Sequence, residues 1–221
     1  QNFKLYSEFG KLFSSEEHMD PNNESFLPGY GLIPLGLKGH YGPISFNLEY
    51  RQNDRYFVYN FWDRAYDINR STVDESTETI TTKADQLYQY GSLKGVYFNV
   101  SGNILNAVSM GISFQDLKGE IWNHSSNEWF DDNNRTLLGT ISLNASFIPK
   151  IRYLNAFYQK SNFSELSFNE PDINTIYGYN LGIDFSESMV LVYKSRTSFE
   201  PDGQGGVEPV YSMFVETQIL F

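Results

Sequence analysis

The chain has 221 residues, no cysteine and a net charge of −11. The lack of cysteine excludes disulfides, thiolate metal sites and cysteine nucleophiles, and the acidic balance disfavours nucleic-acid binding, which needs basic side chains for phosphate contacts. No run of 18 apolar residues occurs, so the sequence holds no candidate membrane helix. With 17 % aromatic residues, the chain is not an acidic disordered protein, and its composition suits a soluble β protein or a membrane β-barrel.

Alternation of apolar and polar residues predicts ten strands, and no segment shows a helical period of 3.6 residues. In chain order the strands are expected at 3–13, 30–41, from 44 to a break near 52–54 or onward to 62, 87–100, 108–115, 137–147, 151–159, 177–185, 189–196 and 211–221. Polar loops are expected at 14–25, 69–83, 118–134, 160–174 and 200–209, and tight turns near 42, 102, 149 and 187. Counting back from the last residue, the tight turns all fall on the side of the C-terminus and the long loops on the other.

This sorting of loops by length favours a transmembrane barrel over a soluble sandwich. Sandwich strands are usually five or six residues long, and a sandwich need not place its long loops on one side. The apolar faces also carry aromatic residues near their ends, which is typical of the interfacial girdles of membrane barrels. The aromatic residues in question are Tyr41, Tyr50, Phe114, Phe147, Tyr177, Phe185, Tyr211 and Phe221.

The last strand carries the most specific motif of the chain. Tyr211, Met213, Val215, Ile219 and Phe221 share one face at a spacing of two, with a polar Thr217 among them. A last strand of this kind, ending on an aromatic residue, resembles the signal of outer-membrane β-barrels that the bacterial barrel-assembly machinery inserts. No narrower subfamily is indicated.

The resemblance implies an all-β fold: one antiparallel transmembrane β-barrel over residues 1–221, with about ten strands, short periplasmic turns and long extracellular loops. It places the protein in the bacterial outer membrane, among outer-membrane lipids and lipopolysaccharide, with the assembly machinery as a partner. The chain opens on Gln1 without an initiator methionine, so either a signal peptide has been removed or the ten strands are the C-terminal part of a larger barrel. No cofactor is indicated.

Polar residues of the inward faces are the best candidates for function. The expected lumen-lining residues are Glu49, Arg51, Asn144, Asn180, Asp184, Lys194, Arg196, Glu216 and Gln218. Lys194 and Glu216 should meet across the last hairpin. The opposite charges either fill the narrow interior or line a polar pore.

The predicted barrel allows two functions, depending on whether its interior conducts. The first is a narrow channel for small polar solutes or ions, without enzymatic chemistry. The alternative is a non-conducting barrel that binds lipopolysaccharide or a partner protein, through acidic extracellular loops or at the periplasmic side.

Two loop motifs suggest further chemistry. His124-Ser125-Ser126-Asn127 matches the His-x-Ser-Asn pattern of lipid A deacylases, and this resemblance implies Ser126 as nucleophile and His124 as base; the alternative reading is a solvated loop. The carboxylates of Glu128, Asp131 and Asp132 are candidate calcium ligands, because Ca²⁺ prefers oxygen donors.

Overall fold

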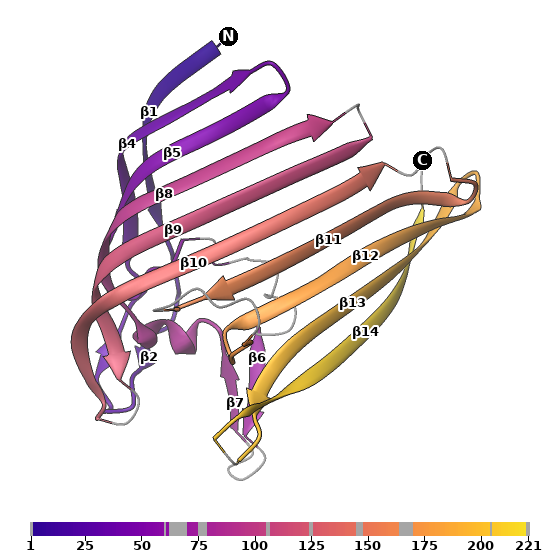
Figure 1. Cartoon of the computed structure of the whole chain (residues 1–221). Helices are drawn as coiled ribbons and strands as arrows, with labels where there is room; N and C mark the ends of the chain where they lie inside the picture. Colours follow the sequence, from indigo (N-terminus) through magenta and orange to yellow (C-terminus); the bar gives the residue numbers. More distant parts are fainter. Residues whose placement is uncertain are drawn as a thin grey trace.

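The computed structural model describes residues 2–59, 61, 70–74, 79–104, 107–123, 126–144, 148–163, 170–203 and 205–219. Ten antiparallel strands form one sheet in which neighbours in the chain are neighbours in space (Figure 1). In sheet order they are β1 (Asn2–Lys11), β4 (Tyr30–Tyr41), β5 (Ile44–Asn53), β8 (Tyr90–Ile104), β9 (Val108–Asn123), β10 (Glu128–Asn144), β11 (Ile151–Ser161), β12 (Thr175–Ser186), β13 (Met189–Pro201) and β14 (Val207–Ile219).

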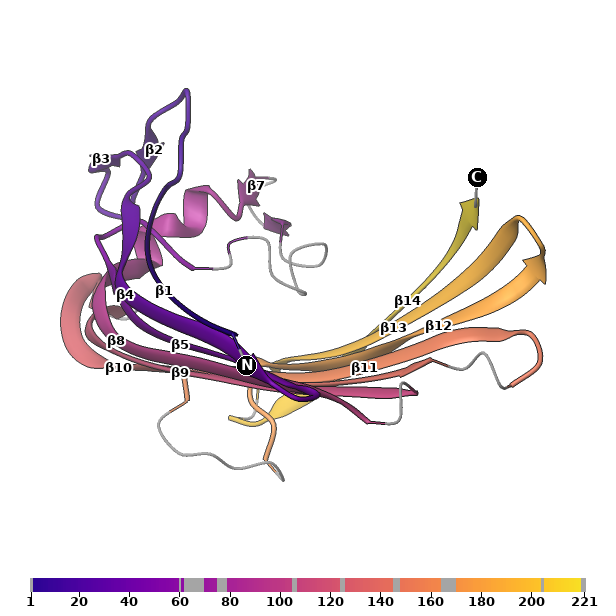
Figure 2. The same ribbon diagram turned by 90° about the horizontal axis from the view of Figure 1, so that it is seen from above.

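Short elements occupy the longer connections. β2 (His18–Met19) pairs with β3 (Ser25–Phe26), β6 (Ser71–Asp74) pairs with β7 (Thr79–Thr82), and a 3-10 helix, η1, spans Asp85–Gln89. η1 and the β6–β7 pair lie on the concave side of the sheet, whereas the β2–β3 pair lies at its rim, beyond the ends of β1 and β4 (Figure 2). No helix within the described ranges has the length and hydropathy needed to cross a membrane.

The antiparallel, all-β character that the alternation predicted is confirmed, and the main sheet has the expected ten strands. The prediction of ten strands in all was wrong, because four short strands lie in or beside segments expected to be loop. The strand expected at 87–100 also begins later, at Tyr90, because η1 occupies residues 85–89. Such pieces are too short for a two-residue period to be recognised in the sequence.

The expected loop at 118–134 was also wrong. β9 continues to Asn123 and β10 begins at Glu128, and the two strands pair along this whole stretch. Cross-strand side-chain pairs support the ladder here: the Trp122 and Trp129 rings lie 5.1 Å apart, and Arg135 lies 3.5 Å from Asp116.

The expected closed barrel is not present in the described residues. β1 pairs with β4 and β14 pairs with β13, and no ladder joins β1 to β14. The sheet is instead a curved, open wall with its first and last strands at opposite edges (Figure 2). β1 begins and β14 ends at the tight-turn end of this wall (Figure 1).

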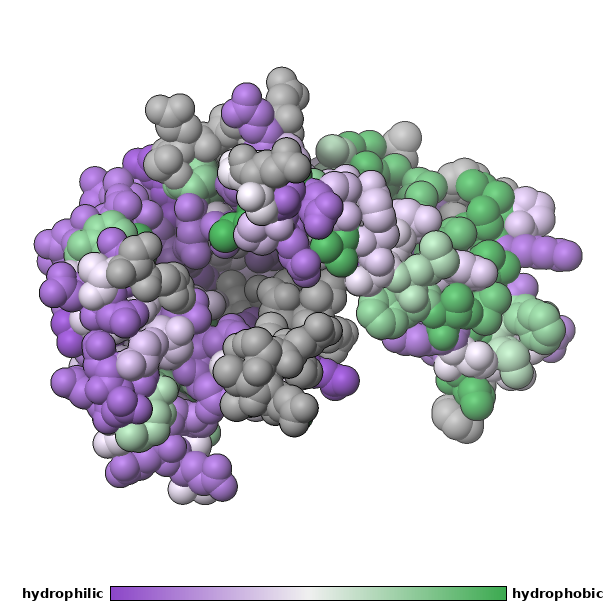
Figure 3. Space-filling view, turned by 90° about the horizontal axis from the view of Figure 1, so that it is seen from below, coloured by the Kyte–Doolittle hydropathy of each residue, from purple (hydrophilic) through white to green (hydrophobic). Residues whose placement is uncertain are grey.

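Strand register sorts the side chains onto two unlike faces. Leu48, Phe98, Phe114 and Leu137 follow one another across β5, β8, β9 and β10 on the convex face. Large apolar side chains on this face are exposed on both edge strands and on the strands between them. Seen from below, hydrophobic residues gather on the right, where the turn ends of β11–β14 lie, and hydrophilic ones on the left (Figure 3).

Candidate functional site on the concave face

All nine residues predicted to line a lumen share the concave face, as the strand register shows. Asn180 pairs directly with Lys194, and the Lys194 ammonium lies 2.7 Å from the Glu216 carboxylate, as expected for the last hairpin. Whether these residues line a pore stays a prediction, because the sheet is open.

A buried ion pair lies on the concave face of β5. Glu49 and Arg51 are only 5 % and 6 % exposed, and Arg51 Nε donates a hydrogen bond of 2.6 Å to Glu49. Asn47 donates a second bond of 2.6 Å to this carboxylate, and the Tyr6 hydroxyl donates a third from β1. Buried charges need such partners, because an unpaired one would lose its hydration without compensation.

The Arg51 guanidinium extends this network toward the middle of the sheet. It donates to Gln115 of β9 at 2.9 Å and lies 3.5 Å from the centre of the Tyr97 ring. Tyr59, from the segment after β5, covers it on another side at 4.7 Å. A cation between two aromatic faces is held in one place, so Arg51 is a fixed positive charge of the concave face.

The sequence did not single out Tyr6, Gln115 or Tyr97 for this site. The signal for Tyr97 was masked because Val96 and Phe98 flank it, so that apolar residues run together and hide the alternation.

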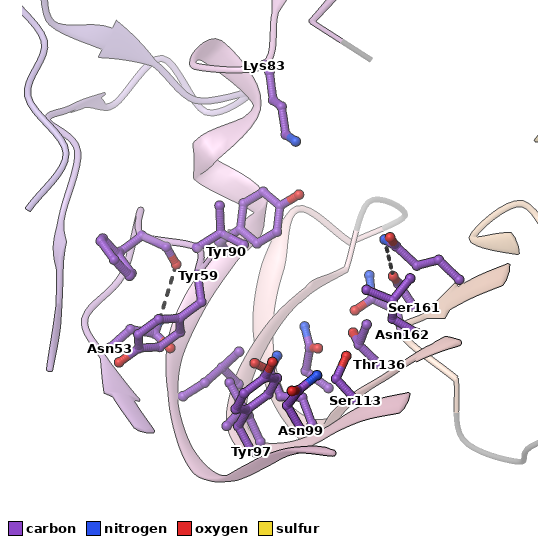
Figure 4. A pocket seen from close by; sticks show the side chains of 18 residues that line it. Asn53, Tyr59, Lys83, Tyr90, Tyr97, Asn99, Ser113, Thr136, Ser161 and Asn162 are labelled. Carbon is purple, nitrogen blue, oxygen red and sulfur yellow. Dashed lines mark hydrogen bonds between the residues drawn. The ribbon is translucent and has the colours of Figure 1, made fainter. Parts of the chain in front are cut away.

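A cavity of about 510 Å³ adjoins this network. Its floor is the sheet, from which Tyr97, Asn99, Ser113 and Thr136 point into the cavity (Figure 4). Tyr90 lines it from the start of β8, while Tyr59 and Lys83 approach from the covering segments. Twelve of the eighteen lining residues carry a hydroxyl or amide group, so the cavity suits water or a small polar solute that exchanges hydrogen bonds with them.

The other half of the concave face is more densely packed. Leu138, Phe157 and Ile176 form an apolar cluster, and the Arg196 guanidinium lies 4.8 Å from the Phe157 ring. Nearer the turn end, Val190 is fully buried. Side chains therefore fill part of the space that a polar passage would need.

The loop end of the sheet is held by a second ion pair, outside the apolar band. On the convex face of β9, apolar Ile112 and Phe114 give way to Asp116, Lys118 and Glu120. Glu120 accepts two hydrogen bonds from Arg55, of 2.7 and 2.5 Å. These bonds, which outweigh partial burial, hold the pKa of Glu120 below its ordinary value of 4.5 and raise that of Arg55.

The motifs expected to carry other chemistry find little support. Ser126 is exposed in the turn after β9, where its N–H donates to the Asn123 side chain at 3.4 Å, and His124 lies outside the described residues. The deacylase-like pair therefore stays a prediction.

The calcium candidates do not form a site. Asp131 and Asp132 are successive residues of β10, so they point to opposite faces of the sheet. Within the described ranges, no group of three or more His, Cys, Asp or Glu side chains comes together as metal donors.

The residues of the expected assembly signal lie on the convex face of the edge strand β14. Tyr211, Met213, Val215 and Ile219 are all exposed there, and Phe221 lies outside the described residues. Comparison with protein-family models, with curated proteins and with solved structures found no match to this chain.

Proposed function

We propose that the chain is the wall of a bacterial outer-membrane β-barrel whose concave face lines a narrow passage for small polar solutes or ions. One observation carries the proposal: every strand of the sheet exposes large apolar side chains on its convex face, whereas the charged and amide side chains of the strands gather on the concave face, beside one apolar cluster. An exposed apolar surface of this extent is typical of contact with lipid, and the opposite polarity is typical of a barrel lumen.

Closure of the wall within a bilayer follows from backbone chemistry. An open sheet edge leaves N–H and C=O groups unpaired, and each costs several kcal/mol where no water can reach. β1 and β14 run in opposite directions, because β1 begins and β14 ends at the tight-turn end (Figure 1). Antiparallel pairing of these two edges is therefore the simplest way to complete the barrel.

The outer-membrane location and the assembly route rest on the last strand. Its exposed row of Tyr211, Met213, Val215 and Ile219 supplies the pattern that the assembly machinery recognises. Lipopolysaccharide and other outer-membrane lipids are the partners of the convex face.

Two features of the interior favour different behaviour. The cavity beside Arg51 favours passage of small polar solutes, whereas the cluster of Leu138, Phe157 and Ile176 favours a filled, non-conducting barrel. A filled barrel would act through its acidic loop end, by binding lipopolysaccharide or a partner protein.

Planar-bilayer conductance of the refolded chain tests the passage. Discrete conductance steps are expected, with cation preference reduced in Glu216→Ala, because this exposed carboxylate lies on the concave face. Lys118→Ala is the matched control, since Lys118 is exposed on the convex face, outside any lumen.

Silence from a folded, membrane-inserted protein would overturn the passage and leave the filled barrel. Equal effects of the Glu216 and Lys118 substitutions would show that conductance does not run along the concave face.

A further inference from the structure

A serine, a histidine and an aspartate form a chain of hydrogen bonds at the loop end, outside the network of the concave face. Ser14 follows β1, His18 begins β2 and Asp85 begins η1. His18 Nε2 lies 3.0 Å from Ser14 Oγ, and His18 Nδ1 lies 2.7 Å from Asp85 Oδ1. The imidazole thus bridges a hydroxyl and a carboxylate through its two nitrogens, which is the arrangement of a nucleophile, its base and the group that orients the base.

The donors of this chain follow from its chemistry. An ionised carboxylate only accepts hydrogen bonds, so His18 Nδ1 carries a hydrogen and its N–H donates a hydrogen bond to Asp85. In the neutral imidazole, Nε2 is then an acceptor, and the Ser14 hydroxyl donates to it. This is the tautomer in which histidine can take the proton of serine.

Neighbouring groups fix the aspartate and the histidine. Asp85 Oδ2 accepts hydrogen bonds from the Thr82 N–H at 2.8 Å and from Thr82 Oγ1 at 2.7 Å. Burial alone would raise the pKa of Asp85, but the bonds from Thr82 and His18 outweigh it and lower the pKa below its ordinary value. The Phe26 ring lies 5.6 Å from the His18 ring and stacks on Tyr56 at 4.6 Å, so the imidazole is packed against a supported aromatic face.

The surroundings indicate the class of substrate. Phe13 and Met19, the neighbours of Ser14 and His18 in the chain, are large apolar side chains exposed to 85 % and 55 %. Acidic Glu16 and Glu17 stand exposed between the serine and the histidine and would repel an anionic substrate. A neutral substrate with an apolar group suits this site best.

We propose that Ser14, His18 and Asp85 form a catalytic site that hydrolyses neutral carboxylic esters with an apolar acyl chain. It uses residues other than His124 and Ser126 and does not depend on passage through the barrel.

The reaction has two balanced halves. Ser14 Oγ bonds to the ester carbonyl carbon while its proton passes to His18 Nε2, and the resulting tetrahedral oxyanion collapses by breaking the bond to the alcohol oxygen, which takes that proton. Water then attacks the acyl-serine, gives one proton to His18 Nε2 and releases the carboxylic acid as Ser14 Oγ recovers a proton. Asp85 stays ionised throughout and stabilises the imidazolium.

A fluorophosphonate probe tests the nucleophile directly in the refolded full chain. The probe should form a covalent adduct at Ser14, mapped by fragment mass spectrometry. Ser14→Ala should abolish labelling, and His18→Gln should slow it by about 100-fold or more, which is the usual loss on removing a general base. Ser15→Ala, at the next position of the same loop, should label like the unmodified chain.

Hydrolysis of p-nitrophenyl butyrate should follow the same order among the variants and should also fall in Asp85→Asn. The adduct in the unmodified chain identifies its own residue, so this readout holds even if Ser14→Ala fails to fold. A folded chain that takes no label, or labelling that persists in folded Ser14→Ala, would overturn the proposal. The three residues would then only connect the loop after β1 to η1 by hydrogen bonds.

Discussion

The charged side chains of the two ion pairs differ in burial, so the pairs contribute differently to the stability of the fold. Glu49 and Arg51 are buried with several hydrogen-bond partners, whereas Arg55 and Glu120 keep 41 % and 29 % of their side chains exposed. A partly exposed pair is screened by water and contributes roughly 0.5 kcal/mol, while breaking a buried pair costs about 3–5 kcal/mol.

Replacement of Glu120 by glutamine should lower thermal stability at neutral pH, by about 0.5 kcal/mol. Because the pKa of Glu120 in the folded state lies below 4.5, its contribution is present above that pH and is lost as the pH falls through the folded-state pKa. The difference between the two proteins should therefore shrink as the pH falls below 4.5, as measured by melting in detergent from pH 3 to 7.

Glu128→Gln, which removes another exposed carboxylate at the same end of the sheet, is the control for net charge. A Glu120→Gln effect that does not shrink as the pH is lowered from 7 to 3, or that Glu128→Gln reproduces, would contradict this account.

Replacing Arg51 alone should lower the free energy of unfolding more than replacing both Glu49 and Arg51. Arg51→Met leaves Glu49 charged and buried, and we expect a cost of about 3–5 kcal/mol in urea unfolding. The double variant Glu49→Gln with Arg51→Met removes the stranded charge and should recover part of this cost. A double variant less stable than the single one would show that the two residues do not act as a pair.

At the scale of strands, the sequence predicted most elements where one face is clearly apolar. β5, β9, β12 and the strands after it alternate cleanly, so their positions and inward residues could be predicted. β8 and β11 alternate poorly because aromatic residues occupy both faces, as Tyr153 and Phe157 do on the concave side of β11. The extension of β9 and β10 was missed because its residues are polar and its pairing is visible only across strands.

Tyrosine rings packed on glycines join neighbouring strands on the concave face. A methyl group at Gly36 of β4 would lie 2.4 Å from the Tyr6 ring of β1, and one at Gly182 of β12 would lie 2.6 Å from the Tyr153 ring of β11. The first contact matters more for the network, because the Tyr6 hydroxyl donates to Glu49 and Asn47. The absence of a side chain at Gly36 thus positions a partner of the buried ion pair.

Gly36→Ala should displace the Tyr6 ring and destabilise the fold by about 1–3 kcal/mol, the usual cost of overpacking. Gly139→Ala in β10 is the matched control, because no atom lies within 4 Å of the added methyl group, and it should change stability by less than about 0.5 kcal/mol. Urea midpoints compare the two. Equal midpoints would show that Tyr6 relocates without loss.

For the whole molecule, the sequence predicted two faces and ten strands in one sheet, but not an open edge. Local alternation determines which side of a strand is apolar, whereas closure depends on how curvature and stagger accumulate over all ten strands. The alternation within a single strand therefore does not reveal the total curvature and stagger of the sheet.

The proposed pairing of β1 with β14 can be tested by disulfide trapping, because the chain has no cysteine of its own. Leu5→Cys, combined in turn with Met213→Cys and Val215→Cys, should give an intramolecular crosslink in at least one pair after membrane insertion, since disulfides need Cα atoms within about 7 Å. Leu5→Cys with Ile112→Cys, on the same face but four strands away, should not crosslink.

Crosslinks only between chains would show that two copies complete one wall. No crosslink in any pair would favour additional strands between the two edges, as in a larger barrel.

The unbroken neighbour order of the main sheet has a consequence for how the protein folds. Each ladder from β1 to β14 joins strands that follow one another in the sheet and in the chain, so hairpins can add one at a time at low contact order. Pairing β1 with β14 would join residues about 200 positions apart, and closing so long a loop costs more entropy than closing any single hairpin of the sheet. Refolding should therefore show fast formation of the sheet and one slow, late step, the closing of the ring.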